Sequence, residues 1–235
     1  MRRSKLLTQM LVVGTIASAI LIALSLSIHW FPSQSSSQAH KIDTLYDVLL
    51  IASVPFFVLV LVVVGFSVWK FRHRPGDPLK DGPPLHGNTR LEIVWTAFPA
   101  LLLVSLCTYA YVVLHDIEKS QKGEYVVNVT GQQFAWRFDY AQGGGKAVSD
   151  ELYLPVGQPV VFKVHALDVL HDFWVPSFRM KIDAVPGITT TIRVKPTRVG
   201  TFPIVCAELC GLGHSEMRST VHVVSGPQFA AWLKQ

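Results

Sequence analysis

The chain has 235 residues, of which half are hydrophobic and only 16% are charged. Soluble domains usually carry about 25% charged residues, so this composition indicates membrane segments. The formal net charge is +5, but the excess of Lys and Arg lies beside the apolar segments of the first half. An excess of basic residues in this position indicates membrane topology and gives no reason to expect nucleic-acid binding. Three cysteines are too few for a disulfide framework.

The first apolar segment, residues 6–28, follows a short basic start and has no charged side chain. At about 1.5 Å per residue, a helix of this length spans a hydrocarbon core of about 30 Å. The segment is long for a signal peptide, yet Ser37-Gln38-Ala39 has the small-residue spacing of a cleavage site. A cleaved signal and an uncleaved anchor therefore both stay open for residues 1–39, in which 32–39 are expected to form a polar linker.

Two further apolar segments, at about 45–69 and 91–114, predict an antiparallel membrane hairpin within residues 40–115. Each segment contains one proline, which a membrane helix tolerates because neighbouring groups satisfy the carbonyl that it frees. The connecting loop, residues 70–84, is rich in Lys, Arg, Pro and Gly, and short basic loops stay cytoplasmic. We therefore expect residues 116–235 on the outer face of a bacterial-type plasma membrane.

From residue 124 onward the pattern changes to short alternating segments rich in β-branched and aromatic residues. Such segments, separated by turn residues, are typical of an all-β sandwich, and about 110 residues suffice for one domain of this kind. Strands are expected at residues 125–130, 134–140, 151–155, 160–166, 189–195, 200–206 and 219–224, with a turn at 142–145 and a terminal helix over 226–235. The predicted fold is a membrane α-helical hairpin, preceded by a signal or anchor helix and followed by an all-β sandwich.

A short run near the C-terminus brings together two thiols, one imidazole and one thioether, from Cys206, Cys210, His214 and Met217. Such soft ligands favour copper over hard cations. A mononuclear blue-copper site needs one Cys, two His and a weak axial Met, so this run has one Cys too many. A second thiolate allows two sulfurs to bridge two metal ions, each of which then needs one imidazole. His171 is the best candidate for the second imidazole.

Simpler interpretations of the same run leave ligands unexplained. A disulfide between Cys206 and Cys210 accounts for neither His214 nor Met217. A hydrolytic catalyst needs an open ligand position, which a fully ligated pair of ions lacks. A zinc-structured module and a membrane-tethered copper carrier remain as alternatives, although a simple tether needs only one helix.

The spacing Cys-x-Glu-x-Cys-Gly-x-x-His-x-x-Met, with Val-x-His-x-Phe-x-Val-Pro-x-Phe upstream, closely resembles subunit II of haem-copper cytochrome c oxidases. The resemblance runs from about residue 46 to the C-terminus. It implies a cupredoxin-like copper domain that takes electrons from a c-type cytochrome or a small copper protein. It also implies that the electrons pass to haem in subunit I, where oxygen is reduced and protons are translocated. The copper subunit of a nitric oxide reductase is an alternative, because the gas depends on subunit I.

The resemblance also implies a dinuclear copper centre with six ligand residues. These are His171, Cys206, Glu208 through its backbone carbonyl, Cys210, His214 and Met217. In the family the two thiolates bridge both coppers, each imidazole binds one copper, and the thioether and the carbonyl are weak ligands. The side chain of Glu208 corresponds to a carboxylate that helps to bind a magnesium or manganese ion shared with subunit I, and carboxylates suit such hard ions.

Two further positions follow from the resemblance. Glu92, in Leu-Glu-Ile-Val-Trp-Thr, matches a Glu at the mouth of a proton pathway into subunit I, the alternative being a residue that simply lies outside the hydrocarbon. Phe134 and Trp136, in Gly-Gln-Gln-Phe-Ala-Trp, match the segment that accepts electrons from the donor. The family usually has Trp where this chain has Phe134, so both Phe134 and Trp136 are candidates for the accepting residue.

Overall fold

The computed structural model describes residues 2–73, 75–76, 82, 84, 86–140 and 148–234. The turn expected at 142–145 and most of the basic loop between the hairpin helices lie outside these residues. The chain divides into two compact units. One unit consists of Met1–His29 and Leu45–Tyr111, and the other of Trp30–Thr44 and Val112–Gln235.

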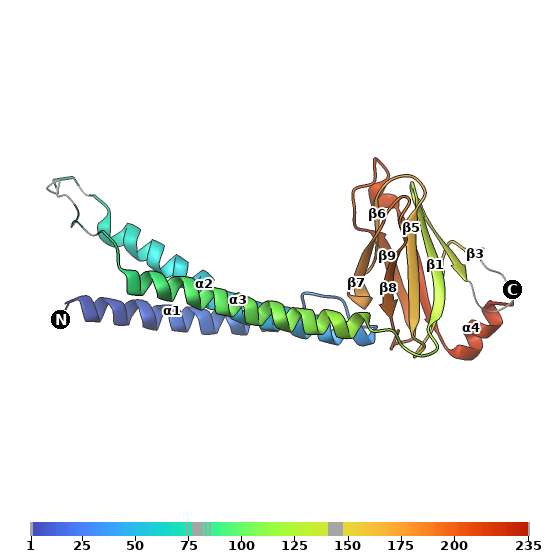
Figure 1. Cartoon of the computed structure of the whole chain (residues 1–235), viewed down its shortest axis with the longest axis horizontal. Helices are drawn as coiled ribbons and strands as arrows, with labels where there is room; N and C mark the ends of the chain where they lie inside the picture. The colour runs from blue at the N-terminus through green and yellow to red at the C-terminus, as the bar shows by residue number, and fades with distance from the viewer. Residues whose placement is uncertain are drawn as a thin grey trace. The chain divides into compact units, whose positions relative to one another are not determined.

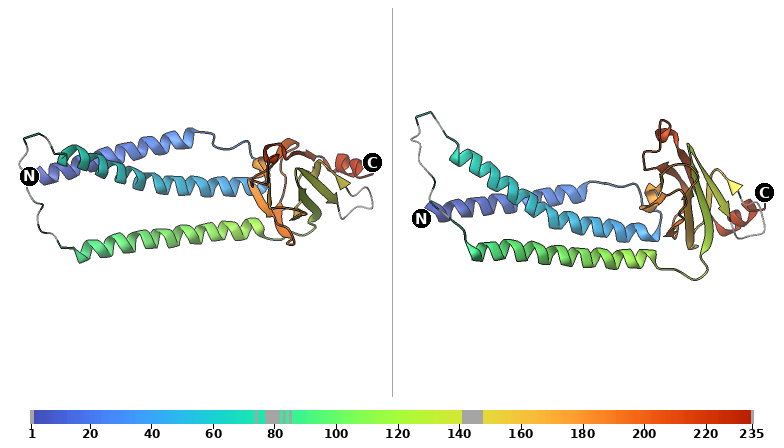
Figure 2. Two further views of the ribbon diagram at one scale, coloured as in Figure 1. Left: turned by 90° about the horizontal axis from the view of Figure 1, so that it is seen from above. Right: turned by 45° about the horizontal axis from the view of Figure 1, so that its top comes forward.

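Three long helices make up the first apolar part of the chain (Figures 1 and 2). They are α1 (Arg2–Ser27), α2 (Ser37–Phe71) and α3 (Thr89–Glu118). All three are long and apolar enough to cross a membrane, and their apolar side chains are largely exposed. An exposed apolar surface of this extent is stable in lipid rather than in water. The helices α2 and α3 contain the expected segments 45–69 and 91–114 and continue through Pro55 and Pro99.

The second unit is a β-sandwich, as predicted. Its strands are β1 (Tyr125–Gln132), β2 (Ala135–Tyr140), β3 (Val148–Ser149), β4 (Leu152–Pro155), β5 (Val160–Ala166), β6 (His171–Val175), β7 (Met180–Ala184), β8 (Thr190–Val194), β9 (Gly200–Cys206) and β10 (Arg218–Val224). One sheet has the order β3-β2-β1-β5-β8 and the other β4-β10-β9-β6-β7. Short helices η1 (Pro176–Phe178) and η2 (His214–Glu216) interrupt the second sheet's connections, and α4 (Gly226–Trp232) ends the described fold. The strands β3, β6 and β7 were missed by the sequence prediction.

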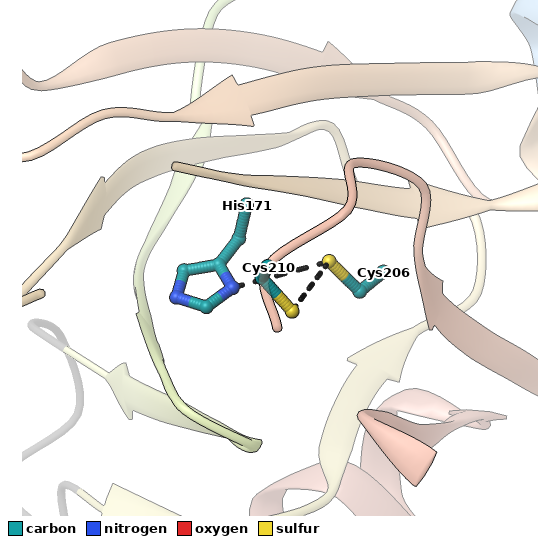
Figure 3. Close-up of side chains that lie close together, drawn as sticks. All are labelled: His171, Cys206 and Cys210. Atoms are coloured by element: carbon teal, nitrogen blue, oxygen red, sulfur yellow. Dashed lines mark hydrogen bonds between the residues drawn. The ribbon is translucent and has the colours of Figure 1, made fainter. Parts of the chain in front are cut away.

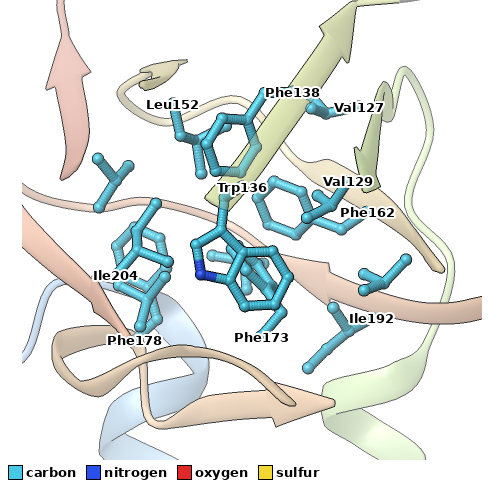
Figure 4. Close-up of a cluster of buried hydrophobic side chains, with 14 of the residues drawn as sticks. Val127, Val129, Trp136, Phe138, Leu152, Phe162, Phe173, Phe178, Ile192 and Ile204 are labelled. Atoms are coloured by element: carbon cyan, nitrogen blue, oxygen red, sulfur yellow. The ribbon is translucent and has the colours of Figure 1, made fainter. Parts of the chain in front are cut away.

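Alternating side chains from the two sheets fill the space between them (Figure 4). Val127 and Val129 of β1 and Phe138 of β2 point inward, as the period of two predicts, and are fully buried. The ring of Phe173 from the opposite sheet contacts that of Phe138 edge-on, at a centroid distance of 6.1 Å. Burial of each such side chain contributes about 1.5–3 kcal/mol, so this apolar layer rigidly fixes the strands that carry the metal-site residues.

The segment Trp30–Thr44 belongs to the sandwich unit and is called the strap below. The N–H of Ser35 donates to the carbonyl of Ser177 (3.0 Å), and the N–H of Thr197 donates to the carbonyl of Ser35 (2.9 Å). The side chain of Gln38 accepts the N–H of Lys195 at 3.1 Å. The expectation of a polar linker at 32–39 is therefore wrong in part, because α2 begins at Ser37 and the strap's polar groups are buried against main-chain partners far away in sequence.

Arg179, a residue of the sandwich, forms hydrogen bonds with the strap. Its Nε donates to Oδ1 of Asp43 at 2.7 Å, and one Nη donates to Oδ2 of Asp43 at 3.0 Å. The guanidinium also donates to the carbonyls of Pro32 (2.6 Å) and Pro176 (3.0 Å). Only 6% of the Arg179 side chain is exposed, so this bidentate pair is well shielded from water and far stronger than a surface ion pair.

Candidate metal centre

Two neighbouring strands carry the first two site residues, His171 and Cys206. His171 is the first residue of β6 and Cys206 is the last residue of β9, and these strands pair antiparallel with Phe173 opposite Cys206. The sequence analysis expected no strand at residues 171–175, so it missed that His171 opens one. The strand position makes His171 fully buried and gives its ring a fixed direction.

The other site residues come from the connection between β9 and β10. His214 opens η2, and Met217 caps its end directly before β10. The N–H of Cys206 donates to the carbonyl of Met217 at 3.1 Å, so the two ends of the connection are joined by a main-chain hydrogen bond. The loop therefore closes on itself and turns Cys210 inward between them, where Cys210 and Met217 are both buried.

All six residues expected as ligands lie together (Figure 3 shows His171, Cys206 and Cys210). The ligand atoms of those three residues all lie within 4.8 Å of one another. The two Sγ atoms are 3.9 Å apart. Cys206 Sγ lies 4.0 Å from His171 Nδ1 and 3.2 Å from the Glu208 carbonyl oxygen. Cys210 Sγ lies 3.6 Å from His214 Nδ1 and 3.8 Å from Met217 Sδ. Because a disulfide needs about 2.05 Å between sulfurs, both thiols are free.

Asp168 orients the ring of His171. Its Oδ1 lies 2.9 Å from His171 Nε2, which leaves Nδ1 facing the sulfurs. Asp168 also accepts the main-chain N–H groups of Gln133 and Val169, each at 2.7 Å. Burial raises the pKa of this carboxyl, but the hydrogen bonds from Gln133 and His171 outweigh burial and hold the pKa below its usual value. A carboxylate on the far nitrogen of a metal-ligating His fixes the ring and increases its basicity.

Gln133 joins the two parts of the site. Its main-chain N–H holds Asp168, and its Nε2 donates to the carbonyl of Cys210 at 2.6 Å. One turn residue between β1 and β2 therefore braces both the His171 side and the Cys210 side. The sequence prediction missed Gln133, because a single Gln in a turn carries no signal apart from its position beside the aromatic segment.

The glycines of the loop allow a close approach to this turn. Gly211 has a φ of +133°, and a Cβ there would lie 2.9 Å from Nε2 of Gln133. Gly213 has an ordinary φ of −93°. Glycine is needed there because a Cβ would lie 2.6 Å from the ring of Phe134. The ring of Phe134 thus lies directly on the backbone of the metal loop.

The electrostatics of the site disfavour free thiolates. Burial raises the pKa of the Cys210 thiol to about 11, and the neighbouring Cys206 adds to this increase. Two adjacent buried thiolates repel each other, so they need a cation between them before both lose their protons. The site residues are therefore suited to holding positive charge.

The two aromatic candidates differ in exposure. Phe134 lies in the turn between β1 and β2 and is 37% exposed, whereas Trp136 of β2 is 3% exposed. The Trp136 ring packs edge-on against His171, at a centroid distance of 6.1 Å, and against Phe173 at 5.5 Å. Its Nε1 is buried and has no hydrogen-bond partner in the described part of the chain.

The two candidate carboxylates lie in different surroundings. Glu208 is exposed and lies within electrostatic reach of buried Asp172, whose pKa is raised mainly by burial. Lys181 Nζ lies 3.0 Å from Asp172 Oδ2. Glu92 is exposed in the first turn of α3, and its Oε1 accepts the N–H of Asn88 at 3.1 Å. In this chain Glu92 thus also caps the start of its helix.

The fold and the site define a class: a membrane-anchored, cupredoxin-like domain whose buried soft ligands suit copper. A family model described as "Cytochrome C oxidase subunit II, transmembrane domain" matches residues 10–113, and one described as "Cytochrome C oxidase subunit II, periplasmic domain" matches residues 145–224. The cytochrome c oxidase subunit 2 of Thermostichus vulcanus is 34% identical, over 87% of this chain and 77% of that protein. The chain belongs to the cytochrome c oxidase subunit II family.

A further sequence relative agrees with this assignment. The cytochrome c oxidase subunit 2 of Cereibacter sphaeroides is 31% identical, over 87% of this chain and 78% of that protein. By these sequence relatives the chain is an oxidase subunit of a copper-binding family, and they do not favour a nitric oxide reductase subunit or a free-standing carrier. The chain is also similar to the crystal structure of the periplasmic domain of subunit II of cytochrome oxidase from Bradyrhizobium japonicum, which is 30% identical, has a TM-score of 0.45, and covers 49% of this chain and 94% of that chain.

Proposed function

We propose that this chain is the electron-accepting subunit of its oxidase and holds a dinuclear copper centre between β6 and the β9–β10 connection. The observation that carries the proposal is the convergence of six potential ligands from these two elements. Two thiols, two imidazoles, a thioether and a carbonyl are more donors than one copper ion takes, and they suit two. Bound there, the copper pair would take up and release single electrons.

The residues have distinct roles in this proposal. Cys206 and Cys210 would hold both ions through their thiolates, His171 and His214 would each supply an imidazole to one ion, and Met217 and the Glu208 carbonyl would be weaker ligands. Asp168 holds the ring of His171 in both oxidation states, because its hydrogen bonds to the turn and to Val169 do not involve the metal. Burial by the sandwich core excludes water, so little rearrangement accompanies electron transfer.

Phe134 and Trp136 are proposed to have different roles. A partner protein at the surface can contact Phe134, whose ring lies on the metal loop, but it cannot contact buried Trp136. Trp136 instead lies against His171, where it keeps the inner side of the site apolar. We infer that Phe134 is the contact through which electrons arrive, and that Trp136 supports the ligand ring.

The remaining assignments concern partners and location. We infer that electrons come from a c-type cytochrome or a small copper protein and pass to haem in subunit I. The domain would lie on the outer face of the membrane, as the basic loop between α2 and α3 predicts. The exposed side chain of Glu208 is free to share a magnesium or manganese ion with subunit I. Glu92, near the other end of α3, is proposed to open towards a proton pathway.

Purification of the chain in mild detergent tests the proposal. We expect it to come with a haem-bearing subunit, with copper and without stoichiometric zinc. Metal analysis and a haem spectrum are the measurements. A chain that runs alone, or one that carries zinc in place of copper, would remove the proposal.

A further inference from the structure

Residues 35–38 of the strap complete the main-chain hydrogen bonding of the sandwich. The N–H of Ser37 donates to the carbonyl of Lys195 at 3.0 Å, and Oγ of Ser36 donates to the carbonyl of Phe178 at 2.9 Å. With the bonds described above, these four strap residues pair with five main-chain groups of the sandwich. Buried main-chain groups rarely lack partners in folded proteins, so the sandwich is complete only when the strap is present.

The expected cleavage site, Ser37-Gln38-Ala39, lies within this buried segment. Gln38 is 3% exposed and Ala39 is fully buried. Oγ of Ser36 accepts the N–H of Ala39 at 3.1 Å, as an N-cap of α2 does. Cleavage after Ala39 would therefore separate α2 from its cap and its first residues. Proteolytic cleavage concentrates at exposed loop tips, and this site is not one.

A second pair of small residues at the same spacing, Ser25 and Ser27, lies in the last turn of α1. Oγ of Ser27 donates to the carbonyl of Leu24 at 2.7 Å, so this site is helical. The helix α1 has 26 residues, whereas the apolar part of a signal peptide has about 7–15 and a membrane span needs about 20. Its length is therefore that of a membrane anchor.

The helix α1 also shares a surface with α2. Both belong to the same compact unit, and side chains from both line a hollow of about 560 Å³. Gly14 and Ser18 of α1 lie on this hollow with Pro55 and Val58 of α2, and Val58 is 3% exposed. Small residues four positions apart are typical of contacts between membrane helices. Figure 2 shows α1, in dark blue, beside the N-terminal half of the chain that forms α2.

We propose that α1 is not removed and that it stays in the mature chain as a third membrane helix. The strap is then a permanent link between α1 and the sandwich. This link begins shortly after Ser27, because the guanidinium carbon of Arg179 lies 4.9 Å from the centroid of the Phe31 ring. The inference concerns membrane architecture, goes beyond the proposed function and does not depend on bound copper.

The charges on either side of the helices agree with three passes. Residues 2–5 contain three basic side chains, which places the start of α1 in the cytoplasm. One pass through α1 brings the strap to the outer face, and the hairpin of α2 and α3 returns the chain to that face. The sandwich therefore lies on the side that the basic loop between α2 and α3 predicts independently.

The N-terminus of the mature chain is the first test. The oxidase that contains this chain is expressed from the full 235-residue sequence and purified in mild detergent, and the chain is analysed by mass spectrometry. We expect an intact mass of 26.1 kDa and peptides from residues 4–29. A mature chain that begins at Leu26, Ile28 or His40, or at any other residue within or after α1, would overturn the proposal.

Cysteine labelling is the second test, because it reports on which side of the membrane α1 begins. Ser4→Cys lies near the start of α1, and Lys122→Cys is the matched control at an exposed position after α3. A membrane-impermeant maleimide is added to intact spheroplasts, with wild type as the background for the three native cysteines.

We expect Lys122→Cys to react in intact spheroplasts and Ser4→Cys to react only after the membrane is permeabilised. Reaction of Ser4→Cys in intact spheroplasts, or its absence from the mature chain, would contradict a retained α1 that starts in the cytoplasm. Neither measurement involves the metal, so a failure here leaves the proposed function standing, and a chain without copper leaves this inference standing.

Discussion

The two ends of the β-sandwich use polar groups in opposite ways. At the strap end, Arg179 pairs with Asp43, and the buried Ser35 and Ser36 of the strap bond to main-chain groups of the sandwich. At the ligand end, Cys206 Sγ lies 3.9 Å from Cys210 Sγ and 4.0 Å from His171 Nδ1, which is close but short of strong hydrogen bonding. The strap end is therefore complete without a further component, whereas the ligand end is arranged to receive one.

This difference separates stability from function along one domain. Substitutions at the strap end should change the free energy of unfolding and leave the metal centre intact. Substitutions of the ligand side chains themselves should do the reverse. The strands β6 and β9 both run between the ligand end and the strap end, so the rigidity of one end positions the other.

The largest effect is expected at the ligand end, from Cys210→Ser. A serine hydroxyl remains protonated at neutral pH and is a hard ligand, so one of the two bridges is lost. We expect complete loss of the dinuclear centre and of electron transfer, measured by copper content and by turnover of the oxidase. The copper-free form should unfold within about 1 kcal/mol of copper-free wild type. Retention of two coppers by this variant would contradict the bridging role.

Arg179→Ala should have the largest effect at the strap end. Among the described residues it leaves the Asp43 carboxylate with the side chain of Gln34 alone, and it removes donors from two carbonyls. We therefore expect a loss of about 3–5 kcal/mol in the free energy of unfolding. Denaturant titration of the detergent-solubilised chain measures this loss, and the copper signal should be unchanged. Arg198→Ala is the control, because Arg198 is exposed and donates to Ser33 of the same strap. Its cost should be below about 1 kcal/mol.

The strap also shows where sequence reasoning reaches its limit. The helices and most strands were predictable, because hydrophobic period is a local signal. The donor spacing likewise pointed to residues that the fold brings together. The burial of Ser35 and Ser36 was not predictable, because their partners Ser177 and Phe178 lie more than one hundred residues away. Cleavage after Ala39 would remove these contacts. They are therefore relevant to whether residues 1–39 are a cleaved signal peptide or an uncleaved anchor.

Within the site, the sequence shows which side chains can bind a metal, but it does not show which residues hold those side chains in place. His171 was chosen for its side chain, yet its position on β6 depends on pairing with β9. Gln133 and Asp168 contact the site through side chains whose positions depend on loop geometry, which a single sequence does not display. The sequence thus predicts which atoms can bind a metal, while the fold determines what holds those atoms in place.

Asp168→Asn tests one such support. The amide keeps the shape and can still accept a hydrogen bond, but it loses the negative charge that makes the His171 ring more basic. We expect copper affinity to fall by about tenfold to a hundredfold, measured by competition with a chelator, while the fold is kept. Asp150→Asn, at an exposed position before β4, is the matched charge control and should bind copper as wild type does. If both variants bind copper with equal affinity, the contact between Asp168 and His171 does not support copper binding.

Gly213→Ala should give the smallest effect. The added methyl would lie 2.6 Å from the Phe134 ring, but that ring is partly exposed and can move aside. We expect a loss of about 1 kcal/mol in the free energy of unfolding, and the double variant with Phe134→Ala should recover most of it. The double-mutant cycle is the measurement, and simple additivity would mean that ring and loop are not in contact.

The electron paramagnetic resonance spectrum of the oxidised chain, taken together with its copper content, shows whether the chain holds a copper pair. We expect two coppers per chain and one unpaired electron shared equally between two copper nuclei, seen as the hyperfine pattern of a matched pair. A single copper with the pattern of one nucleus, or a chain that binds no copper while His171, Cys206 and Cys210 are intact and reduced, would contradict it.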